Sequence, residues 1–213
     1  MKTNLIKKSH RGHDLVSIED ELFNNRRVIF FDEEVAPETA QQLISQLLML
    51  EIQQPGEPIL LYLNSPGGSC TDGLAIIDVL ESMTSPVYTC ALGICASMAA
   101  VILAAGEKGH RSASVHSKVM IHEPLISGGL GGSATTIDRT AKSILETKKT
   151  INTLLAKYTG KTLKEINNAT SFDNYMSAAD ACAYGLCDSI STCLDFKGFV
   201  NTDDIENRKE TEI

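Results

Sequence analysis

The fold of this chain is decided by the stretch Ile59-Leu60-Leu61-Tyr62-Leu63-Asn64-Ser65-Pro66-Gly67-Gly68. Its first half is almost entirely apolar, which is typical of a strand covered on both faces of a parallel sheet. A turn with two glycines follows, and Leu74, Ile77 and Leu80 then keep the spacing of a helix. A strand, a turn and a helix in this order form the repeating unit of an α/β fold.

The same unit occurs on both sides of this stretch. The predicted strands are residues 27–31, 59–63, 87–91 and 119–122, and the predicted helices begin at Pro37, after Gly68 and at Ser97. We expect a turn at Gly93, before the alanine-rich helix that runs from about Ser97 to Ala105. Alternation of strands and helices predicts an α/β chain with a largely parallel sheet.

A long helical pattern occupies residues 134–158. At the usual rise of an α-helix this segment would measure about 37 Å. Such a length is unusual inside a compact domain, so we expect the helix to project and meet another subunit. Farther along, Ser177-Ala178-Ala179-Asp180 has the pattern of a capping box, and Gly185 suits the end of the helix that follows.

The composition limits the possible functions. The chain has 213 residues and a net charge of −8, which fits one globular domain and disfavours a nucleic-acid surface. We find no apolar run long enough to span a membrane and no signal peptide, so we expect a cytoplasmic protein. The six cysteines lack a C-x-x-C pair and are interpreted as small buried thiols rather than as disulfides or metal ligands.

Three residues could together attack an acyl carbon. Ser97 stands where a strand turns into a helix, His122 ends an apolar strand, and Asp173 could accept the second N–H of an imidazole. Each also has a purely structural interpretation, as a helix cap, a half-buried histidine or a turn aspartate. The order Ser, His, Asp differs from that of chymotrypsin-like, subtilisin-like and α/β-hydrolase enzymes, so a triad here would belong to another scaffold.

The two glycines at 67 and 68 are a fourth candidate element. They follow a buried strand directly, which lets the backbone approach a ligand and direct N–H groups toward it. An ordinary tight turn is the alternative. A phosphate-binding loop is disfavoured because no Lys-Ser/Thr follows the glycines, and we expect no cofactor.

Taken together, these segments resemble the ClpP family, the proteolytic subunit of the Clp protease. The resemblance rests on 64–68, Ala96-Ser97-Met98-Ala99, Met120-Ile121-His122-Glu123-Pro124, Met176-Ser177-Ala178 and Tyr184-Gly185-Leu186-Cys187-Asp188. It implies a crotonase-like α/β fold and a serine peptidase in which Ser97 is the nucleophile. His122 would be the general base and then the general acid, and Asp173 would orient it. The backbone N–H groups of Gly68 and Met98 would form the oxyanion hole.

The resemblance also implies an assembly. Heptameric rings would stack in pairs to form a tetradecamer around a closed chamber, with helix 134–158 at the contact between rings and the glycine-rich stretch 128–132 beside the substrate path. A Clp-family AAA+ unfoldase would feed in unfolded proteins. The expected division of the chain is a flexible arm at 1–25, a ClpP-like peptidase domain at 26–192 and a polar tail at 193–213.

This chain departs from the family pattern at a few positions. Glu123 follows His122 where the family usually has Gln, and Phe172 precedes Asp173 where the family usually has an Arg that pairs between rings. Leu60 stands where a second docking aromatic is common. Two alternatives stay open: a weakly active or structural subunit of a mixed ring with a second ClpP-like chain, and a crotonase-type acyl-CoA enzyme.

Overall fold

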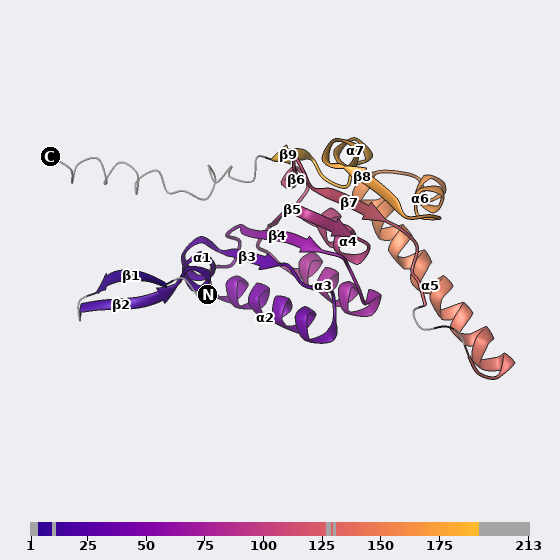
Figure 1. Ribbon diagram of the computed structural model, residues 1–213, viewed down its shortest axis with the longest axis horizontal. Helices are drawn as coiled ribbons and strands as arrows, with labels where there is room; N and C mark the ends of the chain where they lie inside the picture. Colours follow the sequence, from indigo (N-terminus) through magenta and orange to yellow (C-terminus); the bar gives the residue numbers. More distant parts are fainter. Residues whose placement is uncertain (1–3, 10–11, 127–128, 130, 192–213) are drawn as a thin grey trace.

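The computed structural model describes residues 4–9, 12–126, 129 and 131–191. Its centre is a mostly parallel sheet, which confirms the predicted α/β class (Figure 1). The sheet contains seven strands: β3 (Val28–Phe31), β4 (Ile59–Ser65), β5 (Val87–Ala96), β6 (Arg111–Ser114), β7 (Lys118–Ile121), β8 (Asn174–Ser177) and β9 (Ser189–Ser191). The strand order is β3-β4-β5-β6-β9, and β7 pairs with both β5 and β8. Of these pairs only β7–β8 is antiparallel.

Helices cover this sheet and extend beyond it. They are α1 (Ile18–Arg26), α2 (Pro37–Gln53), α3 (Cys70–Ser82), α4 (Met98–Ala104), α5 (Ala134–Thr159), α6 (Leu163–Ala169) and α7 (Ala178–Tyr184). Helices α2 and α3 lie along β3 and β4, whereas α6 and α7 lie at the other end of the sheet, beside β8 and β9 (Figure 1). Helix α5 has 26 residues and projects away from the body of the molecule, as the sequence predicts.

The core surrounds β4 and α4. Ile59, Leu61 and Leu63 on β4 are fully buried, as expected for a strand with covered faces. All seven residues of α4 are buried as well, and alanines at several of its positions let neighbouring elements approach closely. Because α4 begins directly after Ser97, a helix with every residue buried fixes the position of that serine.

The turn predicted at Gly93 is wrong. Strand β5 continues through this residue to Ala96 and changes partner on the way: its first half pairs with β6 and its last three residues pair with β7. The register to β4 shifts at the same place, and the side chain of Asn64 accepts a hydrogen bond from the backbone N–H of Ile94 at 3.1 Å. Gly93 has a φ of 58°, so it provides a bulge within a strand instead of an end to it.

The amino-terminal region is more structured than the expected arm at 1–25. Strands β1 (Asn4–Ser9) and β2 (Gly12–Ser17) form an antiparallel hairpin, and α1 follows directly. Phe23 and Leu22 of α1 pack against the two hydrophobic clusters of the body, which makes α1 part of the folded domain. The predicted tail at 193–213 and Gly128 of the glycine-rich stretch lie outside the described residues.

Strand β6 was not predicted because it has little apolar sequence. Its stability comes from Arg111, which is 3% exposed and makes a bidentate ion pair with Asp188. The same guanidinium donates to the carbonyl oxygens of Ala104 and Tyr158 at 3.0 and 3.1 Å, near the ends of α4 and α5. One buried cation therefore joins β6, two helix ends and the segment before β9.

Two further observations concern the described residues only. Their five cysteines are all free thiols. No helix among them is long and apolar enough to cross a membrane.

Candidate active site

Ser97 occupies an uncommon backbone conformation between β5 and α4. Its φ is 55° and its ψ is −123°, a region that residues with a side chain rarely adopt. Its N–H donates to the carbonyl oxygen of Met120 at 2.8 Å, which attaches this turn to β7. Although Ser97 stands at the cap position of α4, its side chain makes no capping hydrogen bond. The helix-cap interpretation of this serine is therefore wrong.

The Ser97 hydroxyl meets His122 instead. The distance from Ser97 Oγ to His122 Nε2 is 2.8 Å, and the distance from His122 Nδ1 to Asp173 Oδ1 is 3.0 Å. An ionised carboxylate only accepts hydrogen bonds, so Nδ1 carries the proton and Nε2 accepts from the serine hydroxyl. The histidine side chain is 15% exposed, whereas that of Asp173 is 63% exposed. The structure thus brings together the three side chains singled out from the sequence.

The pairing of β7 with β8 explains why His122 and Asp173 meet. These strands run antiparallel with Ile121 opposite Asn174, so the residues just beyond that pair, His122 and Asp173, face each other across the same ladder. The residue after His122 is held too, because Glu123 forms an ion pair with Lys148 of α5. Asp173, just before β8, therefore contacts the imidazole, and α5 holds the residue that follows it.

Two backbone N–H groups lie beside the serine. Met98 is the first residue of α4, so its N–H has no acceptor within the helix. Gly68 forms a parallel bridge with Val35. The N–H of Val35 donates to the carbonyl oxygen of Gly67, and the N–H of Ser69 donates to the carbonyl oxygen of Val35, each at 2.7 Å. The N–H of Gly68 itself therefore points away from Val35.

The glycine loop touches the serine directly. A methyl group added at Gly67 would lie 2.5 Å from Ala96 O, 2.6 Å from Ser97 Cβ and 2.9 Å from Met98 N. No side chain larger than hydrogen fits between this loop and the start of α4. The two N–H groups named above therefore belong to backbone segments in van der Waals contact.

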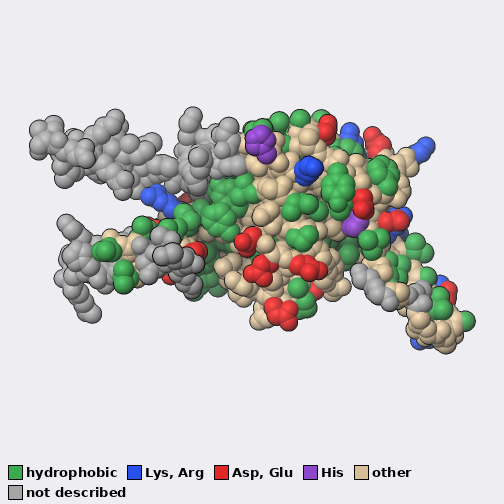
Figure 2. All heavy atoms as spheres, viewed as in Figure 1, with side chains coloured by type: hydrophobic (Ala, Val, Ile, Leu, Met, Phe, Trp, Pro, Cys, Tyr) green, Lys and Arg blue, Asp and Glu red, His purple; other side chains and the backbone are tan. Residues whose placement is uncertain are grey.

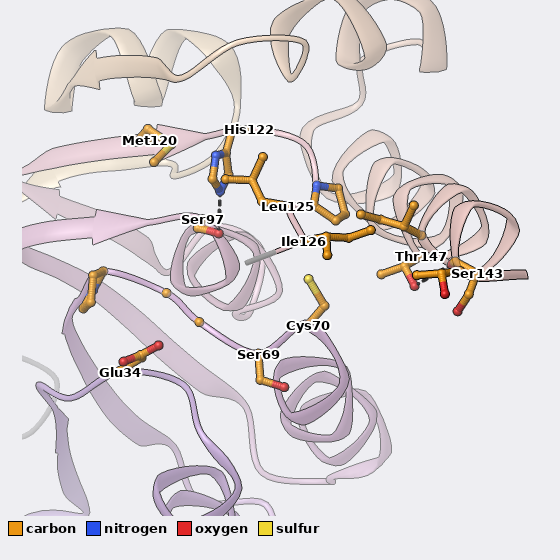
Figure 3. Close-up of a pocket in the computed structure, with 16 residues that line it drawn as sticks. Glu34, Ser69, Cys70, Ser97, Met120, His122, Leu125, Ile126, Ser143 and Thr147 are labelled. Carbon is orange, nitrogen blue, oxygen red and sulfur yellow. Dashed lines mark hydrogen bonds between the residues drawn. The ribbon is translucent and has the colours of Figure 1, made fainter. Parts of the chain in front are cut away.

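A pocket of about 710 Å³ opens beside the serine (Figure 3). Its described lining combines Ser97 and His122 with the glycine loop, the segment after His122 and one face of α5. The described lining residues are Glu34, Pro66, Gly67, Gly68, Ser69, Cys70, Ser97, Met120, His122, Pro124, Leu125, Ile126, Thr140, Ser143, Ile144 and Thr147. Burial raises the pKa of the Cys70 thiol, which keeps it protonated and a poor nucleophile at neutral pH. A serine hydroxyl hydrogen-bonded to an imidazole, as Ser97 is to His122, is more readily activated than a protonated thiol.

Within the described residues no group of His, Cys, Asp or Glu is arranged to hold a metal ion. The site as built can take a proton from a hydroxyl, hold that proton on an imidazole and stabilise a negative oxygen with backbone N–H groups. These are the elements needed for acyl transfer through a serine.

The chain matches the family model for Clp protease over residues 10–193. It belongs to the Clp protease family. The matched residues include β2 and α1. Membership supports a Clp-type peptidase, and the family generally forms rings and works with an unfoldase. It favours the peptidase over the acyl-CoA enzyme that the fold also suggested.

Sequence reasoning did not single out two parts of this Clp protease pocket. Thr140, Ser143 and Thr147 line it from α5, and their spacing of three and four residues was a readable signal of one helix face. Glu34 also lines the pocket, but no local pattern marks it, because it is placed there by the bridge between Val35 and Gly68.

Proposed function

We propose that this chain is a serine endopeptidase that hydrolyses unfolded polypeptides. The observation that carries the proposal is the continuous hydrogen-bonded line from Ser97 through His122 to Asp173, next to a pocket and two backbone donors. The Clp protease match over most of the chain supports the same chemistry.

In the acylation step, Ser97 Oγ attacks the scissile carbonyl carbon while His122 Nε2 removes the hydroxyl proton. Asp173 holds the imidazole in the required tautomer and stabilises the imidazolium that forms. The N–H groups of Gly68 and Met98 donate to the oxyanion of the tetrahedral intermediate, and each such donor is typically worth about 10²–10³ in turnover. His122 then protonates the leaving amine, and the new amino terminus departs.

In the deacylation step, a water molecule replaces the leaving amine. His122 removes a proton from that water, which attacks the ester formed with Ser97. Collapse of the second tetrahedral intermediate returns the proton to Ser97 Oγ and releases a carboxylic acid, which loses its proton to solvent. The same imidazole acts as base and acid in both halves of the cycle.

The proposal includes assembly into stacked heptameric rings fed by an AAA+ unfoldase, in the cytoplasm. Exposed apolar side chains support the ring contacts: Leu145 on the projecting α5 is 61% exposed, and Leu125 is 69% exposed. Between β3 and β4, Phe30 is stacked on Tyr62 with ring centroids 5.1 Å apart and is half exposed, which suits a docking surface.

A second candidate is a weakly active subunit that works only in a mixed ring with another ClpP-like chain. Phe172, next to Asp173, is 60% exposed and supplies no charge where the family usually has Arg. This chain would then need a partner subunit to hold the exposed Asp173 in place.

The catalytic role of Ser97 can be tested by labelling the full chain with a fluorophosphonate and measuring cleavage of a short fluorogenic peptide. Ser97→Ala should abolish both labelling and cleavage. Ser82→Ala, which removes an exposed hydroxyl at the end of α3, is the matched control and should retain both. Labelling that persists in Ser97→Ala would overturn the assignment of the nucleophile.

Native mass spectrometry separates the two assembly candidates. A particle of 14 identical subunits that cleaves peptides supports the homo-oligomeric peptidase. Assembly and cleavage only after a second ClpP-like chain is added would support the mixed ring. Addition of an unfoldase with ATP to the active particle then tests whether folded substrates become cleavable.

A further inference from the structure

The pocket beside Ser97 has two chemically different sides. Toward α5 the lining carries no charge: Leu125, Ile126 and Ile144 are apolar, and Thr140, Ser143 and Thr147 carry hydroxyl groups. On the side away from α5, Glu34 lies beneath the glycine loop (Figure 3). Among the described residues that line this pocket, Glu34 is the single acid, and none is Lys or Arg.

The backbone of Glu34 is fixed from both sides. The next residue, Val35, is 1% exposed and is bridged to Gly68. The carbonyl oxygen of Glu34 itself accepts a hydrogen bond from the Thr39 hydroxyl at 2.6 Å, just inside α2. The side chain therefore starts from a rigid position beside the loop.

The side chain of Glu34 contacts the same loop that lies against the serine. A methyl group added at Gly68 would lie 2.9 Å from Glu34 Cγ. The carboxylate makes no ion pair with a residue that the structure describes. In the face shown in Figure 2, Asp and Glu side chains gather over α2, and no Lys or Arg side chain lies among them. Since no described Lys or Arg pairs with it, this carboxylate can meet a positive group on a bound substrate.

We propose that Glu34 makes this peptidase favour substrates with Lys or Arg at a position next to the cleaved bond. The inference rests on the proposed function, since it assigns a substrate preference to that same site. Alternate side chains of an extended peptide point to opposite sides. A peptide that crosses the glycine loop with one side chain in the uncharged half of the pocket therefore directs a neighbouring side chain toward Glu34.

The expected preference is modest because Glu34 is exposed to solvent. An exposed ion pair of this kind changes kcat/KM by about two- to fivefold. Screening by salt should reduce the preference, since the interacting charges are not buried. The carboxylate also repels the developing oxyanion. This repulsion is the same for every substrate, so it cancels in the ratio of kcat/KM values for two peptides.

The test uses internally quenched peptides of one sequence with Lys, norleucine or Glu placed in turn at the three positions on each side of the cleaved bond. With the full-length protein, we expect kcat/KM for Lys to exceed that for norleucine by about two- to fivefold at one or two adjacent positions. Glu34→Gln should remove this preference, and Glu34→Lys should make the Glu peptide the better substrate. The preference should also shrink in 0.5 M salt.

Glu33→Gln is the matched control, because Glu33 is the exposed neighbour of Glu34 and lies outside this pocket. An unchanged Lys-to-norleucine ratio in Glu34→Gln, or an equal change in Glu33→Gln, would overturn the proposal. Fluorophosphonate labelling of Ser97 in the same samples distinguishes failure of the Glu34 proposal from failure of the peptidase assignment. Labelling without a Lys preference refutes the role of Glu34 alone, whereas absence of labelling refutes the peptidase assignment and this inference with it.

Discussion

The backbone N–H of Glu123 donates to the carbonyl oxygen of Thr170 at 2.7 Å, which joins the segment that carries His122 to the segment that carries Asp173. Thr170 is fully buried, and its hydroxyl accepts from Asn152 Nδ2 of α5 at 3.3 Å. Because α5 projects from the body, this contact connects the orientation of a protruding helix to the distance between an imidazole and a carboxylate.

Replacing Asn152 by Ala should weaken that connection. Asn152 is 1% exposed, and its amide nitrogen also donates to Asn167 Oδ1 at 2.7 Å. Loss of these buried hydrogen bonds should cost about 1–3 kcal/mol in the free energy of unfolding and lower kcat more than it raises KM. Urea denaturation and peptide kinetics measure the two effects. Asn168→Ala, at an exposed neighbouring position, should change stability by less than about 0.5 kcal/mol.

Ser97 should be a site where activity and stability oppose each other. Its φ of 55° strains any residue that has a Cβ, at a typical cost of about 1–3 kcal/mol. Ser97→Gly and Ser97→Ala should both be inactive, but only glycine relieves the strain, so it should be the more stable of the two by about 1 kcal/mol. Thermal unfolding of the two variants provides the comparison, and equal stabilities would contradict a strained serine.

Gly67→Ala should disrupt the site because the added methyl group collides with backbone and side-chain atoms of residues 96–98. We expect peptidase activity to fall by about 10² or more, since displacement of the loop moves the Gly68 donor. Gly56→Ala is the control: Gly56 also has a positive φ, 85°, but nothing lies within 4 Å of an added methyl group. That variant should lose about 1 kcal/mol of stability and keep its activity. Similar activities for the two variants would show that steric contact at the loop is unimportant.

The pair Arg111–Asp188 predicts a specific dependence of stability on pH. Burial of Asp188 raises its pKa, but hydrogen bonds from the side chain and backbone of Arg111 outweigh this effect and lower the pKa to about 2. The pKa of an Asp side chain in an unfolded chain is about 3.9. The stabilisation is therefore present above about pH 4 and is lost as the pH falls toward 2.

Asp188→Asn tests this dependence. The variant should be less stable than the parent chain at pH 7, and the difference between the two should shrink between about pH 4 and pH 2. Chemical denaturation at a series of pH values measures it. Asp138→Asn, which removes one partner of an exposed ion pair with Lys142, should produce little change at any pH. A constant difference across the acid range would contradict the lowered pKa.

The sequence was sufficient for the elements whose stability is local or comes from apolar burial. Strand β4, helix α2 from Pro37 and the long α5 occur as predicted, because apolar periodicity and helix-end residues determine them. Strand β6 and the continuation of β5 through Gly93 were missed, because Arg111 and Asn64 stabilise them through partners distant in sequence.

In the candidate site, too, some features could be predicted from the local sequence and others depend on contacts distant in sequence. Ser97, His122 and Asp173 were found because their residue types and the family resemblance marked them, whereas the backbone strain at Ser97 has no sequence signal. Glu34 was missed because its place beside the loop depends on a bridge between residues more than 30 positions apart in the chain. Residue types therefore indicated the chemistry, and tertiary contacts determined what surrounds it.

The bulge at Gly93 also limits how this chain can evolve. Only a few residues separate the anchoring contact of Ile94 with Asn64 from Ser97, and side chains in that extended stretch point alternately to opposite faces. Inserting or deleting one residue there would turn the nucleophile toward the wrong side of the sheet. Descendants of this sequence can exchange side chains between positions 94 and 97, but they must preserve the length of that interval.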